Sequence, residues 1–207
     1  MYARSTTFTA DPSAIDAGIA HTRVTVLRAV RQIDGCAGLS LLVDRHTGRC
    51  IATTSWADAD ALQRSADEET SLREAAVRTF RGQDVQVEDW SVDVLHRVRY
   101  APHGAATRVI RTRGPAGDME GVVEGFRGIV VPRAELLPGF CSVSFLVDHD
   151  TGRSAIASTY DSRHTMNHAK GQAVAIREEF LDRMGLQVTN IHEYDLVLAH
   201  LRVPEMA

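Results

Sequence analysis

The sequence predicts an α+β fold in which one β-α-β-β-α-β unit occurs twice along the chain. Three observations lead to this prediction. The 207 residues suffice for two small domains, one segment recurs farther along the chain, and both copies show the same order of strand and helix patterns. With 44% hydrophobic and 24% charged residues, the composition is that of a globular protein, which excludes disordered and fibrous classes.

The repeat is visible without gaps. Residues 35–49 align with residues 139–153 at an offset of 104, and eight of these fifteen positions are identical. The same offset aligns further pairs: Arg4 with Arg108, Trp56 with Tyr160, Arg73-Glu74 with Arg177-Glu178, Trp90 with Tyr194 and His96 with His200. We therefore predict a tandem duplication with repeats at 1–103 and 104–207, joined by a turn-rich linker.

The first repeat shows local signals for each element. Asp11 is a suitable N-cap and Pro12 suits the first helical position, and Gly35 follows the end of the predicted helix. The expected elements are a strand at 4–9, a helix to about 32, strands at 39–43 and 50–56, a bent helical region at 57–81 and a strand at 85–98. In the second copy, the first helix, around 119–130, is expected to end or kink at Pro132.

The two inner strands of each repeat are joined by a short turn, 44–49 in the first copy and 148–153 in the second. Asp44 can bond its own turn backbone, and Gly48 can adopt the positive φ that a bulged hairpin requires. Two or three carboxylates in six residues are too few for a calcium loop. The turn is predicted to be structural.

The order of elements is that of the split β-α-β, or ferredoxin-like, unit, which covers one face of an antiparallel sheet with helices. Strands 39–43 and 143–147 do not alternate strictly between polar and apolar residues, which indicates burial of both sheet faces. We expect each copy to cover the other, so that the chain forms an intramolecular pseudo-dimeric α/β barrel.

The charge and cysteine pattern limit the partners. A net charge of −4 gives no basic face for nucleic acid or an anionic membrane, and the chain shows no signal peptide and no long apolar run. Cys36, Cys50 and Cys141 form no C-x-x-C motif, which indicates a reducing, cytoplasmic environment without a metal site. Because no hydrolase, phosphate-loop or dinucleotide motif is present, those chemistries have no support.

Each repeat resembles a domain of the antibiotic biosynthesis monooxygenase (ABM) type, of the dimeric α/β-barrel superfamily. The resemblance rests on Pro138-Gly139-Phe140 followed by residues 158–161, and more faintly on residues 34–36 followed by 54–58. It implies a small-molecule pocket in one or both repeats. Members include cofactor-independent oxygenases, haem-degrading enzymes, isomerases and proteins of unknown role, so the fold constrains function weakly.

The haem-degrading branch implies three side chains that this sequence lacks. The position of its histidine ligand falls at Glu74 and Glu178, and the positions of its asparagine and tryptophan are also vacant, at Thr7, Arg111, Ser65 and Ala169. Because glutamate does not hold haem iron, we expect no haem and no other cofactor. His164 and His168, one turn apart, are the remaining alternative as ligands.

The candidate catalytic residues recur in both repeats. Arg73 and Arg177 could stabilise an enolate, and His96 and His200 could act as a general base. The candidate ligand-binding residues are Trp56, Tyr160, Trp90, Tyr194, Glu74 and Glu178. Structural roles compete with each of these: an Arg-Glu tie between elements, core aromatic packing, and a histidine bonded to a backbone carbonyl.

The sequence thus predicts a protein that binds a small hydrophobic or aromatic molecule. Two classes stay open: a cofactor-independent monooxygenase, or a non-catalytic ligand-binding or stress-related protein. The ligand, the repeat that keeps a working pocket and any further dimerisation also stay open.

Overall fold

The computed structural model describes residues 1–115 and 117–201. In the first repeat, the elements are β1 (Tyr2–Thr9), a 3-10 turn (Pro12–Ala14), α1 (Ile15–His21), a π-helical turn (Thr22–Val26), α2 (Leu27–Val30), β2 (Cys36–Val43), β3 (Arg49–Trp56), α3 (Ala59–Arg64), α4 (Ala66–Thr79) and β4 (Gln83–Arg97). The predicted order of elements is therefore confirmed for this half of the chain.

The second repeat follows the same plan. Its elements are β5 (Ala106–Arg113), α5 (Met119–Gly125), a π-helical turn (Phe126–Val130), α6 (Val131–Ala134), β6 (Phe140–Asp148), β7 (Arg153–Tyr160), α7 (Arg163–His168), α8 (Lys170–Met184) and β8 (Gln187–Leu201). Each strand begins 104 residues after its counterpart, as Tyr2 and Ala106 illustrate, so the sequence offset is also the structural offset.

The hydrogen-bonded strand order confirms the predicted fold class. It runs β1-β3-β2-β8-β5-β7-β6-β4 and returns to β1, which is the connectivity of a closed barrel. Neighbouring strands within a repeat are antiparallel, for example β1 with β3 and β5 with β7. The sheet therefore belongs to an α+β fold built from two ferredoxin-like units.

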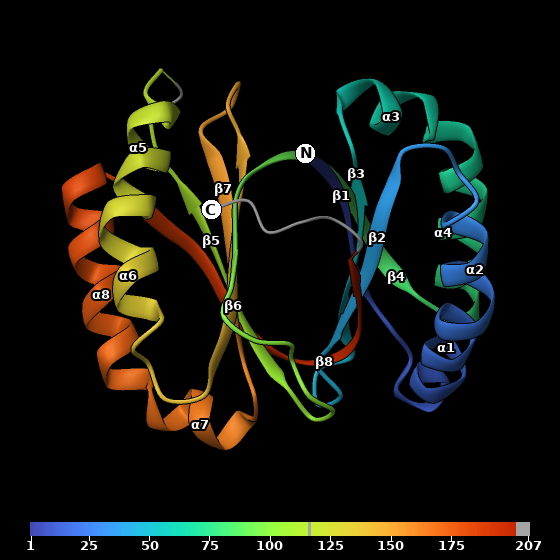
Figure 1. Ribbon diagram of the computed structural model, residues 1–207. Helices are drawn as coiled ribbons and strands as arrows, with labels where there is room; N and C mark the ends of the chain where they lie inside the picture. The colour runs from blue at the N-terminus through green and yellow to red at the C-terminus, as the bar shows by residue number, and fades with distance from the viewer. Residues whose placement is uncertain (116, 202–207) are drawn as a thin grey trace. The chain divides into compact units, whose positions relative to one another are not determined.

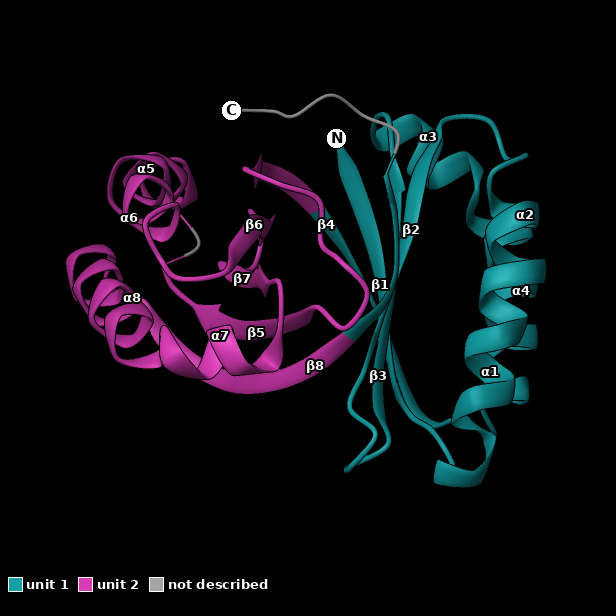
Figure 2. Ribbon diagram, turned by 60° about the horizontal axis from the view of Figure 1, so that its bottom comes forward, with its two compact units in different colours: residues 1–90, 196–203 teal, residues 91–195, 204–207 magenta. Residues whose placement is uncertain are grey.

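Two compact units can be distinguished (Figure 2). Unit 1 contains residues 1–90 together with 196–201, and unit 2 contains residues 91–195. Their limits differ from those of the sequence repeats because β4 and β8 each begin in one unit and end in the other. The second part of β4, for instance, pairs with β6 of unit 2.

Within each unit, helices cover one face of the sheet and the core lies between these layers (Figure 1). In unit 1 the ring of Phe8 from β1 meets Phe80 edge-on, with centroids 5.2 Å apart. In unit 2, Phe126 and Phe145 stack with centroids 4.5 Å apart, and Phe180 approaches Phe126 edge-on. The two cores differ in composition although their backbone plans agree.

The first helix of repeat two corrects one expectation. The helix does not end near Val130, because the chain stays helical through α6 to Ala134, two residues beyond Pro132. The π-helical turn before α6 has a counterpart at Thr22–Val26 in repeat one, where no proline follows. The wider turn therefore belongs to the fold, and Pro132 occupies the first turn after it, where a proline is tolerated.

The two hairpin turns have the predicted structure. Asp44 accepts hydrogen bonds from the backbone of His46 and the hydroxyl of Thr47, and Gly48 has a φ of 76°. Asp148 accepts from Thr151 in the same way, and Gly152 has a φ of 68°. Positive φ is what glycine provides at a bulged turn. Each aspartate thus has a structural role in its turn.

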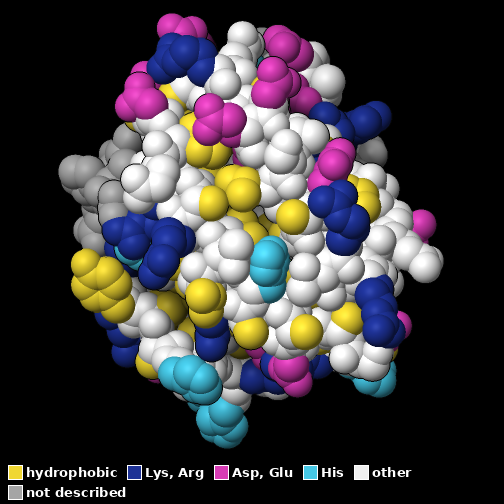
Figure 3. Space-filling model, turned by 90° about the vertical axis from the view of Figure 1, so that its right-hand side faces the viewer, with side chains coloured by type: hydrophobic (Ala, Val, Ile, Leu, Met, Phe, Trp, Pro, Cys, Tyr) yellow, Lys and Arg dark blue, Asp and Glu magenta, His cyan; other side chains and the backbone are white. Residues whose placement is uncertain are grey.

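The surface of unit 1 that Figure 3 presents carries acidic and basic side chains interspersed with apolar ones. Mixed signs on one face do not make the continuous basic surface that nucleic acid requires. Among residues 1–115 and 117–201, every helix is too short or too polar to cross a lipid bilayer.

Candidate functional site

Unit 1 contains a cavity between its helices and its sheet. Strands β1, β2 and β3 form the floor, and the helical segments around Val26 and Leu72 form the roof. The space between atoms, its open mouth included, is about 490 Å³. Most lining side chains are apolar, and the polar exceptions are Thr6, Thr22, Thr54, Glu69 and Arg73.

Unit 2 contains the corresponding cavity, of about 540 Å³ with its mouth. Its walls are also largely apolar, with Ile110, Ile156 and Phe180 among them. The polar lining residues are Arg108, Ser158, Tyr160 and Arg177. In both cavities much of this space belongs to the open mouth, and the enclosed interior is small.

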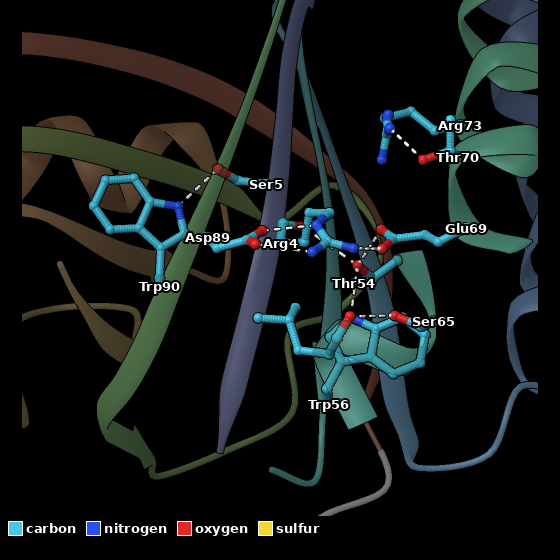
Figure 4. A network of polar contacts seen from close by, with 11 residues as sticks. Arg4, Ser5, Thr54, Trp56, Ser65, Glu69, Thr70, Arg73, Asp89 and Trp90 are labelled. Carbon is cyan, nitrogen blue, oxygen red and sulfur yellow. Dashed lines mark hydrogen bonds and ion pairs between the residues drawn. The ribbon is translucent and has the colours of Figure 1, made fainter. Parts of the chain in front are cut away.

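In unit 1 an ionic network joins β1, β4 and α4, and two of its members, Glu69 and Thr54, line the cavity (Figure 4). Arg4 on β1 donates from Nε and Nη2 to the carboxylate of Asp89, at 2.7 and 2.8 Å, and from Nη1 to Oε2 of Glu69, at 2.7 Å. The other oxygen of Glu69 accepts from Thr54 Oγ1 at 2.7 Å. The hydrogen bond with Asp89, and then Glu69, raises the pKa of Arg4 despite its burial. The guanidinium is fully neutralised by the protein itself.

At the same position in unit 2, the arginine binds one carboxylate instead of two. Arg108 donates from Nε and Nη2 to Oε1 of Glu193, the counterpart of Asp89, at 3.1 and 2.8 Å. Ala173 replaces Glu69, so no second carboxylate reaches the arginine from α8. Among the described residues, Nη1 of Arg108 has no hydrogen-bond partner, although only 6% of the side chain is exposed. The two cavities therefore differ in charge.

Arg73 and Arg177, the predicted anion-stabilising residues, line the two cavities. Arg73 donates from Nη2 to Thr70 Oγ1 at 2.8 Å, and its Nη1 is buried without a partner in the described chain. Arg177 has a buried, unpartnered Nε, and its Nη2 lies 3.7 Å from Glu178. Neither arginine ties its helix to another element through a glutamate of the described chain.

The four predicted aromatic residues are all buried, but they differ in location. Tyr160 lines the cavity of unit 2, whereas Trp56, Trp90 and Tyr194 line neither cavity. Trp56 donates its indole N–H to Thr54 and packs in the core, and Trp90 donates to Ser5. Burial raises the pKa of Tyr160, and the positive charge of Arg108 opposes this rise. Tyr160 is therefore a protonated phenol at neutral pH.

The predicted general bases lie outside both cavities. His96 Nε2 is 2.7 Å from a carboxylate oxygen of Glu135, but the two groups do not have the geometry of a hydrogen bond, and Nε2 has no hydrogen-bond partner in the described chain. His200 lies near the end of β8, and its Nε2 is buried without a partner among residues 1–115 and 117–201. Glu74 and Glu178 are exposed and also lie outside the cavities. The assignment of these two histidines and two glutamates as site residues stays a prediction.

The residues implied by haem chemistry do not gather around a cavity. His164 and His168 are exposed on α7. In the part of the chain that the structure describes, no three His, Cys, Asp or Glu side chains are grouped as metal ligands would be.

Sequence reasoning missed Arg4, Glu69 and Arg108 as site residues. Arg4 and Arg108 were recognised as an aligned pair, but Glu69 has no acidic counterpart in repeat two and so left no signal in the alignment. One signal was available: Arg4 and Arg108 stand at the same place on the first strand of each repeat, and an arginine that a strand buries is rarely left without an acid to neutralise it.

Comparison with known proteins gives close relatives in one genus. No protein-family model matches the sequence. The chain is 40% identical over 207 residues to the uncharacterized protein Rv2558 of Mycobacterium tuberculosis (strain ATCC 25618 / H37Rv). This alignment covers 100% of this chain and 87% of that protein. The uncharacterized protein Rv2557 of the same strain is 40% identical over 206 residues, with 100% and 92% covered.

Solved structures resemble the chain in fold at low sequence identity. A "putative monooxygenase" from Lactobacillus acidophilus NCFM has a TM-score of 0.71 at 11% identity, over 97% of this chain and 96% of that one. An anthrone oxidase-like protein has a TM-score of 0.64 at 15% identity, over 100% and 95%. A ferredoxin-fold protein related to antibiotic biosynthesis monooxygenases, from Listeria monocytogenes 4b F2365, has a TM-score of 0.54 at 10% identity, over 95% and 94%.

Proposed function

Because the chain belongs to the family of the mycobacterial proteins Rv2557 and Rv2558 and has an ABM-like fold, we propose that it binds a small hydrophobic or aromatic molecule. The observation that carries this proposal is the cavity between helices and sheet in each unit, with mainly apolar walls and an arginine on the second long helix. Such a cavity favours an apolar body, and the few polar groups orient it.

The direct test is the identity of what the protein carries. Ligand extracted from purified protein by denaturation is identified by mass spectrometry, and the Ala173→Phe variant is compared with Ala175→Phe. Ala173 lines the cavity of unit 2, whereas Ala175 is exposed two residues farther along α8. We expect the first substitution to displace the ligand from this unit and the second to retain it. Equal ligand content in both variants would argue against binding in this cavity.

Cofactor-independent oxygenation is a second candidate, and the unpartnered guanidinium atoms of Arg73 and Arg177 favour it. A desolvated cation lowers the energy of an enolate. With anthrone as the substrate, deprotonation at the methylene carbon gives the enolate. Electron transfer to dioxygen and recombination give a peroxide, which loses water and leaves anthraquinone. One dioxygen is thus consumed for each anthraquinone and water formed.

This candidate is tested with an oxygen electrode and anthrone. The resemblance to an anthrone oxidase-like protein supports the choice of substrate. We expect dioxygen uptake that falls at least tenfold when Arg73→Ala and Arg177→Ala are combined. Uptake that is unchanged in the double variant, or indistinguishable from the buffer rate, would leave the protein in the non-catalytic ligand-binding class.

A further inference from the structure

We infer that the cavity of unit 2 binds an organic anion, a molecule that joins one carboxylate or enolate to an apolar body, and that residue 173 determines this specificity. The inference rests on the proposed small-molecule function and adds to it the ligand charge and the repeat that holds the ligand. It depends on one difference between the repeats, because Glu69 of α4 corresponds to Ala173 of α8.

Unit 1 shows what satisfies an arginine at this position. Arg4 receives one carboxylate from Asp89 and a second from Glu69, and every nitrogen of its guanidinium has an acceptor. Glu69 is only 4% exposed and also accepts from Thr54, so both of its oxygens are used inside the protein. The carboxylate of Glu69 therefore occupies the place that a bound anion would take.

Unit 2 presents the same arginine without that carboxylate. Glu193 accepts both Nε and Nη2 of Arg108 on a single oxygen, and its other oxygen lies 3.7 Å from Arg163. In the described chain Nη1 of Arg108 is left without a protein acceptor, and this atom keeps some accessible surface although only 6% of the whole side chain is exposed. A buried guanidinium nitrogen without an acceptor is costly, and in this cavity that nitrogen is Nε of Arg177. An anionic ligand would supply the acceptor.

A second cation faces the same cavity. Arg177 also lines it, and its buried Nε has no partner among the described residues. The lining contains no acid, since Ser158 and Tyr160 complete its polar groups and burial raises the pKa of Tyr160. Glu193 serves Arg108, and Glu178 is 3.7 Å from Arg177 and largely exposed. The charge inside the cavity is therefore positive, as a monoanion requires.

The remaining walls define the rest of the ligand. Apolar side chains from β5, β7, α6 and α8 surround the two arginines, and the enclosed interior has room for only a few water-sized groups, so most of a ligand would lie toward the mouth. The anionic group fits beside the arginines, while an aromatic or aliphatic body extends along the apolar wall toward the mouth. Desolvated arginines in such a site bind carboxylate oxygens strongly and with defined geometry.

The experiment compares 2-naphthoate with its neutral analogue 2-naphthamide by isothermal titration calorimetry on the full chain. We expect one naphthoate site per chain and at least tenfold weaker binding of the amide, which lacks the charge. Ala173→Glu should weaken naphthoate binding at least tenfold, because it places the carboxylate found in repeat one beside Arg108. The matched control, Ala175→Glu, adds the same charge on the exposed side of α8 and should bind as the unmodified protein does.

The reverse substitution provides an independent arm. Glu69→Ala removes the internal carboxylate and should raise the naphthoate stoichiometry from one to two sites in folded protein, as monitored by circular dichroism. A single site in folded Glu69→Ala, equal binding of the amide, or unchanged binding by Ala173→Glu would each overturn the inference. Equal binding of acid and amide would leave the proposed function intact, whereas binding of neither compound would contradict both.

Discussion

The carboxylate of Glu69 lies 2.7 Å from Nη1 of Arg4 and joins α4 to β1 inside unit 1. Both side chains are more than 90% buried, so this ion pair is shielded from water. Arg4 and Arg108 occupy the same place in the two repeats, yet only Arg4 has a second internal carboxylate. The negative charge of Glu69 on α4 thus distinguishes the cavity of unit 1 from that of unit 2, although the two are otherwise built alike.

Removal of this carboxylate should destabilise the protein. Glu69→Ala leaves Arg4 Nη1 without its acceptor and Thr54 with only a long hydrogen bond to the Arg4 carbonyl, while Asp89 keeps the other nitrogens of Arg4 satisfied. We expect the free energy of unfolding, measured by urea denaturation, to fall by about 2–3 kcal/mol. Glu74→Ala is the control, because Glu74 is exposed and 3.6 Å from Arg78, and should change it by less than about 0.5 kcal/mol. Equal effects of the two variants would refute a stabilising role for the buried pair.

The contribution of the turn between β6 and β7 to the stability of the protein should depend on pH. Burial raises the pKa of Asp148, but hydrogen bonds from Thr151 and Arg153 outweigh it, so the net pKa lies below its ordinary value. A depressed folded-state pKa stabilises the protein above the unfolded pKa, and this stabilisation is lost as the pH falls through the folded value. Asp148→Asn should cost about 1 kcal/mol at pH 7, and the difference should shrink below about pH 4. A difference that stays constant from pH 7 to pH 3 would contradict this role.

Gly139 should resist substitution. It has a φ of 72°, and an added Cβ would lie 2.4 Å from the side chain of Thr165. Both effects oppose a larger residue, so Gly139→Ala should lower the melting temperature, with a loss of about 2 kcal/mol. Gly171 of α8 is the control, because a Cβ there meets nothing within 4 Å. Gly171→Ala should be neutral or stabilising, by up to about 1 kcal/mol, since alanine favours helix. A loss in both variants would remove the conformational explanation.

The cysteines should react slowly in the folded state. Burial raises the pKa of the Cys50 thiol to about 12, and it also raises the pKa of Cys36 and Cys141. Because the thiolate is the reactive species, Ellman's reagent at pH 8 should label the native protein much more slowly than the urea-unfolded protein, where all three thiols react. Rapid labelling of a thiol in the native protein would show that this cysteine is less buried than the structure indicates.

The duplication made much of the fold predictable. Because residues 35–49 and 139–153 align without gaps, the element order of one repeat could be checked against the other, and each strand recurs at the predicted offset. The π-helical turns had no such signal. A change from i→i+4 to i→i+5 bonding leaves no residue signature, so Pro132 was expected to end or kink a helix that in fact continues to Ala134.

The site was predicted only in part. Arg73 and Arg177 were selected because they recur in both repeats, and both line a cavity. Glu69 was passed over because its partner Arg4 is 65 residues away and its counterpart is alanine. A search for shared residues finds what two copies retain, whereas the functional difference proposed for unit 2 lies where they diverge.

The most direct test is a titration of 15N-labelled protein with 2-naphthoate, followed by two-dimensional NMR with assigned backbone amides. We expect saturable shifts at cavity residues of unit 2, among them Ile156, Ala173 and Arg177, and little change at the corresponding Ala52, Glu69 and Arg73 of unit 1. Shifts centred on unit 1, or no saturable shift in either cavity, would contradict it.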